Sequence, residues 1–169
     1  MAGGLKMADG VTSAEWRAAM GCFPSGVTII TSWDAGEPVG STINAFCSVS
    51  LDPPLLLICL AHQNPILAGL ERSRIFGVNI LPEDGRPIAQ RFAREPLADR
   101  FCEFPYRAAR GGAPQLDAAP VFIDCALEAI YPGGDHVIAV GRGVRIEHTS
   151  AAAPLLYHRG QFPRFNPGD

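Results

Sequence analysis

The sequence lacks several features that mark common classes of protein. Its 169 residues include 14 Lys or Arg and 17 Asp or Glu, so a net charge of −3 offers no basic surface for nucleic acid or an anionic membrane. No apolar run is long enough to span a bilayer. The five cysteines contain no CxxC pair, which argues against a zinc site and favours reduced thiols in a cytoplasmic protein.

The familiar motifs of nucleotide and catalytic sites are also missing. There is no GxxxxGK[ST] loop and no GxSxG elbow, and Gly141-Arg142-Gly143 lacks the third glycine of a GxGxxG fingerprint. No two histidines have the spacing of metal ligands, and the acidic residues are scattered. These absences argue against a P-loop enzyme, a serine hydrolase and a metalloenzyme, and no metal ligand is expected.

What the sequence does contain predicts a mainly β fold with short helices. With 18 glycines and 15 prolines, many turns and short strands are favoured over a helical bundle. Residues 1–10 are expected to form a disordered leader, and 11–169 a single domain built as a barrel with helical insertions. The periodicities predict helices at 12–20, 64–74 and 86–94, and strands at 27–32, 38–45, 55–60, 75–81, 121–131 and 136–148.

The segment from Pro38 to Leu60 has the most informative pattern of the chain. Two strands are expected here, joined by the small residues Cys47–Ser50 and by a turn at Asp52-Pro53-Pro54. Leu55–Leu60 is almost wholly apolar, as in a strand buried on both faces. Small residues between strands let backbone N–H groups approach a flat or anionic ligand. An ordinary β-meander explains the same pattern without a ligand.

Three shorter patterns add local detail. Thr12 and Glu15 have the spacing of a helix capping box. Gly141 and Gly143 alternate with larger residues in a strand, which indicates a bend or bulge. Residues 95–115 are irregular and long enough to predict a functional loop or a partner contact.

A set of short motifs, in a fixed order, resembles one known family. The motifs are Phe23-Pro24-Ser25-Gly26-Val27-Thr28, Val39 to Phe46, Ser48 to Pro54, Phe76 to Leu81, Gly134-Asp135-His136 and Leu155 to Gly160. In this order they resemble the flavin reductase-like family, whose fold is the FMN-binding split β-barrel. The match is to the reductase components of two-component flavin-dependent monooxygenases, and it covers nearly everything from Trp16 to Phe165.

The resemblance implies an activity and an assembly. It implies a homodimer with flavin near the subunit interface, and hydride transfer from NADH or NADPH to FMN or FAD. A partner oxygenase or another acceptor would receive the electrons. Such a reaction needs no protein nucleophile, because the cofactors carry the chemistry. Two alternatives remain open, a passive flavin-binding protein and a reductase of a non-flavin acceptor such as a corrinoid.

The resemblance also implies roles for individual residues. His136 is the expected catalytic residue, orienting the nicotinamide, although a turn histidine bonded to Asp135 is the plainer interpretation. The implied cofactor-binding residues are Thr42, Ile43, Asn44, Ala45, Ser48, Val49, Ser50, Leu51, Asn79, Arg100, Phe101 and Tyr157. Ala45 and Cys47 depart from the hydroxyl residues that the family pattern has there. The helix arginines are expected to face solvent, with one of them a candidate for the flavin phosphate; they are Arg72, Arg74, Arg91 and Arg94.

Overall fold

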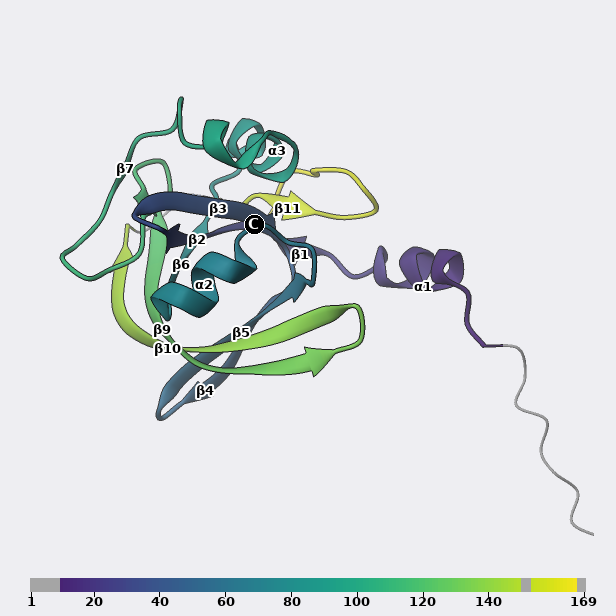
Figure 1. Cartoon of the computed structure of the whole chain (residues 1–169). Helices are drawn as coiled ribbons and strands as arrows, with labels where there is room; N and C mark the ends of the chain where they lie inside the picture. Colours follow the sequence, from purple (N-terminus) through teal and green to yellow (C-terminus); the bar gives the residue numbers. More distant parts are fainter. Residues whose placement is uncertain (1–9, 150–152, 167–169) are drawn as a thin grey trace, which may run out of the picture.

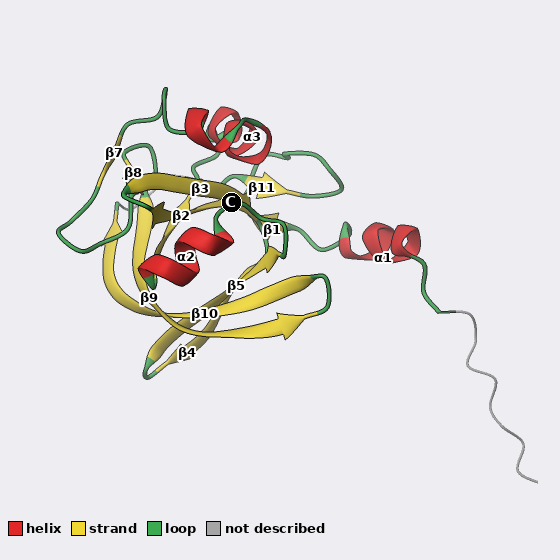
Figure 2. Ribbon diagram, viewed as in Figure 1, coloured by secondary structure: helices red, strands yellow, loops and turns green. Residues whose placement is uncertain are grey.

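The central feature of the fold is one antiparallel sheet of seven strands, in the order β3-β2-β6-β9-β10-β5-β4 (Figures 1 and 2). The computed structural model describes residues 10–149 and 153–166, so the expected leader at 1–10 lies outside the described residues except for Gly10. The strands of the sheet are β2 (Thr28–Asp34), β3 (Glu37–Ile43), β4 (Phe46–Leu51), β5 (Pro54–Ala61), β6 (Ile75–Ile80), β9 (Val121–Gly133) and β10 (His136–His148). Two short pairs accompany it, β1 (Ser25–Gly26) with β11 (Leu156–Tyr157), and β7 (Tyr106–Arg107) with β8 (Gln115–Leu116).

The two edges of this sheet are β3 and β4, which follow one another in the chain. Only Asn44 and Ala45 separate them, and the Ala45 carbonyl accepts a bond from the Cys59 amide at 3.0 Å. The sheet therefore curls until its two edge strands are neighbours in sequence but not in hydrogen bonding. This arrangement is a split β-barrel, and it confirms the fold expected from the sequence.

The core has two parts. The larger one fills the barrel, and its fully buried side chains include Ile30, Ile58, Leu60, Ile66, Leu70, Phe76 and Val78. The second lies beneath α3 (Arg86–Arg94) and contains Val27, Ile29, Leu81, Ile88, Ala89, Phe92, Leu116 and Leu155. The helix thus has the predicted bounds and buries Ile88, Ala89 and Phe92, because apolar residues at helical spacing share one face.

The other helices are shorter than α3. In α1 (Ser13–Met20) the capping box is present, since the Glu15 amide donates to Thr12 Oγ1 at 3.2 Å and the Thr12 amide donates to Glu15 Oε2 at 2.9 Å. No residue of α1 is buried, and the helix stands apart from the barrel (Figure 1). α2 (Leu67–Ser73) begins three residues later than predicted, because the Asn64 side chain accepts from the Ile66 amide and holds a turn there. A 3-10 turn, η1 (Leu97–Asp99), follows α3.

The segment after β3 departs from the sequence prediction in two ways. The small residues Cys47–Ser50 do not cross between strands but belong to β4, where Cys47 pairs with Leu57 of β5. The chain instead crosses between strands at Asn44 and Ala45. The proline turn after Leu51 joins β4 and β5 in a tight hairpin, so the small residues before the turn become part of a strand.

The prediction that Leu55–Leu60 is buried on both faces is also wrong. Leu56, Ile58 and Leu60 are buried, while the residues between them are only half-buried. The physical reason is the position of β5 beside an edge strand, where one face meets the core and the other is only partly covered.

The long hairpin of β9 and β10 supplies the last structural element of the site. Its register shifts between Val140 and Gly141 and again between Gly143 and Arg145, which confirms the predicted bulges. Gly141 is needed because any Cβ there would collide with the Phe76 ring. β10 begins at His136, and the turn between β9 and β10 lies on the same side of the molecule as α1 (Figure 2). None of the described helices has the length and apolarity needed to cross a bilayer.

Candidate functional site

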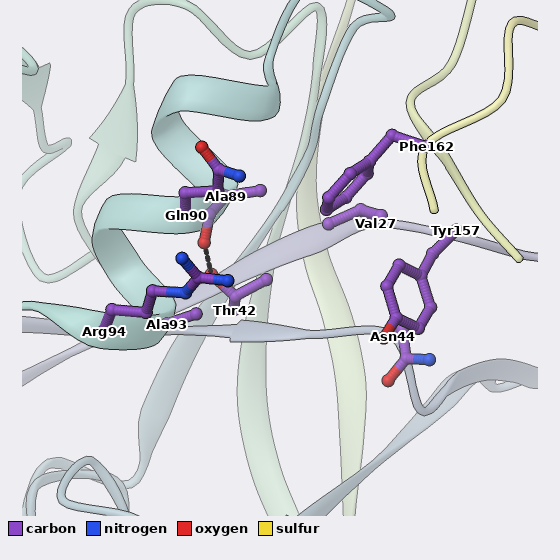
Figure 3. A pocket seen from close by; sticks show the side chains of 9 residues that line it. All are labelled: Val27, Thr42, Asn44, Ala89, Gln90, Ala93, Arg94, Tyr157 and Phe162. Carbon is purple, nitrogen blue, oxygen red and sulfur yellow. Dashed lines mark hydrogen bonds between the residues drawn. The ribbon is translucent and has the colours of Figure 1, made fainter. Parts of the chain in front are cut away.

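A cavity of about 250 Å³ lies between α3, the end of β3 and the C-terminal segment (Figure 3). Its walls are Val27, Thr42, Asn44, Ala89, Gln90, Ala93, Arg94, Tyr157 and Phe162. The alanines of α3 leave the space, and two aromatic rings close the opposite side. No Asp or Glu lines this cavity. It therefore combines a flat apolar wall with a few neutral polar groups and one cation.

Hydrogen bonds fix the polar side of the cavity. Thr42 Oγ1 donates to the Ala89 carbonyl at 2.7 Å, the dashed line of Figure 3, and so joins β3 to α3. Asn44 follows directly after β3, and its Nδ2 donates to Ser25 Oγ at 3.4 Å. Two of the residues predicted to bind flavin are therefore brought to one wall by the end of a single strand.

Tyr157 forms the aromatic side with Phe162. It lies on β11 opposite Ser25 of β1, and its ring meets the Phe162 ring edge-on with centroids 5.5 Å apart. Figure 3 shows the Tyr157 ring reaching toward Asn44. The short β1 and β11 pair thus places an aromatic wall over the polar end of β3.

A second cavity of about 690 Å³ adjoins the first and shares Asn44 and Tyr157 with it. Its other walls are Trp16, Arg17, Met20, Gly21, Phe23, Asp135, His136, Arg159 and Gly160. Because the two cavities share two residues, they form neighbouring halves of one groove. Together they fall in the range of roughly 300–1,000 Å³ that small-molecule sites occupy.

His136 is held in the second cavity by its neighbour. Its Nδ1 lies 2.7 Å from Asp135 Oδ1, and 42% of the side chain is exposed. This hydrogen bond from His136 holds the pKa of the Asp135 carboxyl below its usual range. A carboxylate at Nδ1 favours a proton on that nitrogen, which leaves Nε2 as an acceptor. The expected turn histidine bonded to Asp135 is confirmed, and the same residue lines the groove.

Three of the predicted cofactor-binding residues have their side chains inside the fold. Ile43 belongs to the core. Asn79 is fully buried, donates to the Ile29 carbonyl at 3.1 Å and accepts from the Leu116 amide at 2.8 Å. Arg100 is buried and donates to the Gly40 carbonyl at 2.6 Å. These side chains line neither half of the groove and instead tie strands and loops together.

The remaining predicted residues lie on the surface or beside α3. Ala45, Ser48, Val49 and Leu51 are exposed, and Ser50 is half-buried, on β4 and just before it. As an edge strand, β4 leaves backbone N–H and C=O groups without a strand partner. Phe101 packs edge-on against Phe92 with ring centroids 4.9 Å apart. In the single chain, none of these six residues lines the groove.

Sequence reasoning missed the contribution of α3 to the site. Ala89 and Ala93 are four residues apart, as are Gln90 and Arg94, so each pair shares one side of the helix. That spacing was available in the sequence. What it could not show is that this flank of α3 faces the end of β3, because the contact depends on the tertiary fold.

The arrangement suits binding of planar rings more than covalent catalysis. Aromatic and alanine walls face Thr42, Asn44 and Gln90, which can orient a ring through its polar edge. Within the described residues, no group of three or more His, Cys, Asp or Glu side chains could hold a metal ion. The groove therefore fits an isoalloxazine and a nicotinamide, whose reaction needs orientation rather than a protein nucleophile.

A split β-barrel with a groove of this kind defines a class of flavin-binding proteins. The model of the flavin reductase like domain matches residues 20–166. The chain belongs to the flavin reductase-like family.

Individual relatives agree with this assignment. Over 165 residues the chain is 38% identical to the reductase subunit HsaB of a flavin-dependent monooxygenase from Rhodococcus jostii, covering 97% of this chain and 84% of that protein. It is 34% identical over 167 residues to an NADH:FMN oxidoreductase of Rhodococcus erythropolis, covering 96% and 86%. A solved NADH:FAD oxidoreductase of Streptomyces globisporus, in complex with NAD and FAD fragments, superposes with a TM-score of 0.87 at 33% identity, covering 96% and 98%.

Proposed function

We propose that this protein is an NAD(P)H-dependent flavin reductase that takes FMN or FAD and supplies reduced flavin, or its electrons, to a partner oxygenase. The observation that carries the proposal is the groove whose two halves meet at Asn44 and Tyr157. One half offers a flat wall with neutral polar groups, and the other holds His136. The relatives that the chain resembles are named as reductases of FMN and FAD with NADH as donor.

The residues of the groove have separate tasks in this reaction. When bound, flavin supplies the hydride acceptor, and NADH or NADPH the donor. Thr42 and Asn44 hold the polar edge of one ring. Tyr157 lines both halves of the groove and so keeps the two rings aligned with each other. His136 orients the nicotinamide through Nε2, and Asp135 fixes the imidazole by its bond to Nδ1. Free backbone N–H groups along β4 suit the negative charge that develops on the reduced ring.

The proposal includes a homodimer. Four large apolar side chains are exposed on β4 and β10, the two strands that flank β5, with Leu51 94% and Ile146 65% exposed. The other two are Val49 and Val144. The same stretch of β4 carries Ser48–Leu51, the residues predicted to contact flavin. A second subunit against this surface would cover the apolar side chains and bring those residues into a flavin site.

We also propose an electron acceptor and a cellular location for the protein. Residues 11–169 act as a single domain that passes electrons to a separate oxygenase, as the name of the Rhodococcus jostii relative indicates for that protein. All five cysteines are free thiols, which supports a cytoplasmic location in a reducing compartment.

The test is oxidation of NADH and NADPH by the purified protein, with FMN, FAD, a corrinoid or no acceptor added. We expect oxidation that rises and saturates with added flavin. A protein that binds flavin without oxidising either nucleotide would be a passive carrier. A protein that turns over only with a corrinoid would be a reductase of that acceptor. Either result would contradict the proposal.

A further inference from the structure

The groove continues beyond its two halves, on the side away from α3. A third cavity of about 260 Å³ shares Trp16, Arg17 and Asp135 with the larger half of the groove. It has no lining residue in common with the smaller half, which borders α3. The three cavities therefore follow one another, and Trp16 lies at the junction that does not border the smaller half.

The helix α1 carries Trp16 at this junction. Trp16 and Met20 are four residues apart, so they share one side of the helix, and both line the larger half of the groove. No residue of α1 is buried, and the helix stands apart from the barrel (Figure 1). Trp16 is 59% exposed and Met20 51%. Packing within the fold thus does not account for this apolar side of α1.

An exposed apolar surface beside a cavity is typical of a ligand site. In the proposed mechanism the nicotinamide lies beside His136, next to the flavin. The other ring of NADH and NADPH is adenine, which two riboses and a pyrophosphate separate from the nicotinamide. Adenine is planar and stacks on an indole ring, and a thioether packs favourably at the edge of an aromatic ring. The indole of Trp16 and the thioether of Met20 suit such a ring.

We propose that Trp16 binds the adenine ring of the hydride donor, with Met20 beside it. This inference rests on the proposed function, which supplies NADH or NADPH as the ligand of the larger half. It makes α1 part of the nucleotide site rather than an appendage of the barrel. The protein should therefore distinguish NADH from reduced nicotinamide mononucleotide, which carries the same reactive ring but no adenine.

The test measures equilibrium binding of NADH and of reduced nicotinamide mononucleotide, through the fluorescence of the reduced nicotinamide ring, for the wild type and Trp16→Ala. We expect Trp16→Ala to weaken NADH binding about 5-fold to 100-fold, the loss expected when one base no longer stacks. Binding of the mononucleotide should change less than about 2-fold, because it has no adenine. Trp16→Phe should restore part of the NADH affinity, since phenylalanine keeps an aromatic face.

Two controls separate binding from folding. Alanine has the highest helix propensity and Trp16 is not buried, so Trp16→Ala should leave the helix content and the melting temperature unchanged. Circular dichroism measures both. Phe165→Ala removes another exposed aromatic ring, which lines none of the three cavities, and should leave NADH binding unaltered.

Several outcomes would overturn the inference. Equal losses for NADH and the mononucleotide would mean that Trp16 acts on the nicotinamide end of the ligand. Unchanged NADH affinity in Trp16→Ala would exclude the contact while leaving the proposed function intact. A lower molar mass for Trp16→Ala, with both ligands weakened alike, would assign this side of α1 to a contact between subunits. A wild type that binds neither ligand would contradict the proposed function itself.

Discussion

His136 illustrates how one residue can satisfy both a structural and a functional interpretation. It begins β10 directly after a turn, and its bond to Asp135 would be expected of any histidine there. The same residue also lines a cavity that adjoins the predicted flavin site. A local pattern therefore predicted the contact with Asp135, and only the fold showed that His136 lines a cavity.

We predict that His136→Ala lowers kcat/KM for NADH by about 10-fold to 100-fold, the cost of a misplaced reactant. Flavin affinity should stay the same, because His136 lines the other half of the groove. Steady-state kinetics and a flavin titration measure the two effects. His148→Ala, an exposed histidine at the far end of β10, is the control. Unchanged KM and turnover in His136→Ala would remove His136 from the mechanism.

Other residues show where sequence reasoning stops. Asn44 could be placed at a strand end from the sequence, and it lines both halves of the groove. Asn79 and Arg100 were assigned to flavin by resemblance, but their side chains bond to backbone groups inside the fold. Burial of a polar side chain depends on which strands meet around it, and no local pattern in the sequence reports that.

At the scale of elements, the packing of α3 on β3 determines the shape of the smaller cavity. A Cβ on Gly40 would lie 2.7 Å from Phe92 Cε1 and 3.2 Å from Phe101 Cζ. We predict that Gly40→Ala destabilises the protein by about 1–3 kcal/mol through overpacking. Urea unfolding measures the loss. Gly26→Ala, where a Cβ meets nothing within 4 Å, should leave stability nearly unchanged. Equal midpoints for the two variants would show that α3 can move away from β3.

A second contact between elements attaches the 95–120 segment to β10. Glu147 Oε2 accepts from Gln115 Nε2 at 2.9 Å and from Arg107 Nη2 at 2.8 Å. The Gln115 bond, followed by the Arg107 bond, holds the pKa of the Glu147 carboxyl below its ordinary value of 4.5. Because the pKa of Glu147 is lower in the folded state than in the unfolded state, this stabilisation is fully present above the ordinary pKa of 4.5. It is lost as pH falls through the lower, folded-state pKa.

We therefore predict that Glu147→Gln lowers the melting temperature at neutral pH and flattens the decline of stability below the ordinary glutamate pKa. The effect should be small, since the group is exposed. Thermal unfolding across that acidic range measures both changes. Glu71→Gln on α2 is the control, because Glu71 is exposed and has no assigned contact to this segment. A decline as steep in Glu147→Gln as in the wild type would contradict the assignment.

The sequence predicted α3 correctly but missed β4, and the difference has a physical reason. The bounds of α3 followed from the helical spacing of its apolar residues. β4 was missed because its small, polar residues have little intrinsic strand preference. It is a strand because the turn at Asp52-Pro53 returns the chain along β5. Hydrogen-bond pairing with β5 therefore makes this segment a strand despite its low intrinsic preference.

At the scale of the whole molecule, the exposed apolar side chains of β4 and β10 predict a dimer. Ile146→Glu would place a charge in the proposed interface, so we expect the molar mass in solution to fall from two chains to one. Flavin affinity should fall with it, because Ser48–Leu51 would lose the second subunit. Light scattering after size exclusion measures the mass. Phe165→Glu, a similar change near the C-terminus, should leave it unaltered. A wild type that is already monomeric would contradict the proposed assembly.

In the proposed mechanism, flavin and nicotinamide occupy the two halves of one groove and meet at Asn44 and Tyr157. A crystal structure of the protein with FMN and NAD⁺ tests it most directly. We predict the isoalloxazine in the smaller half beside Thr42, and the nicotinamide in the larger half beside His136. Flavin bound elsewhere, for example in the groove that Pro82, Phe104 and Arg107 line, would exclude this arrangement of the two cofactors.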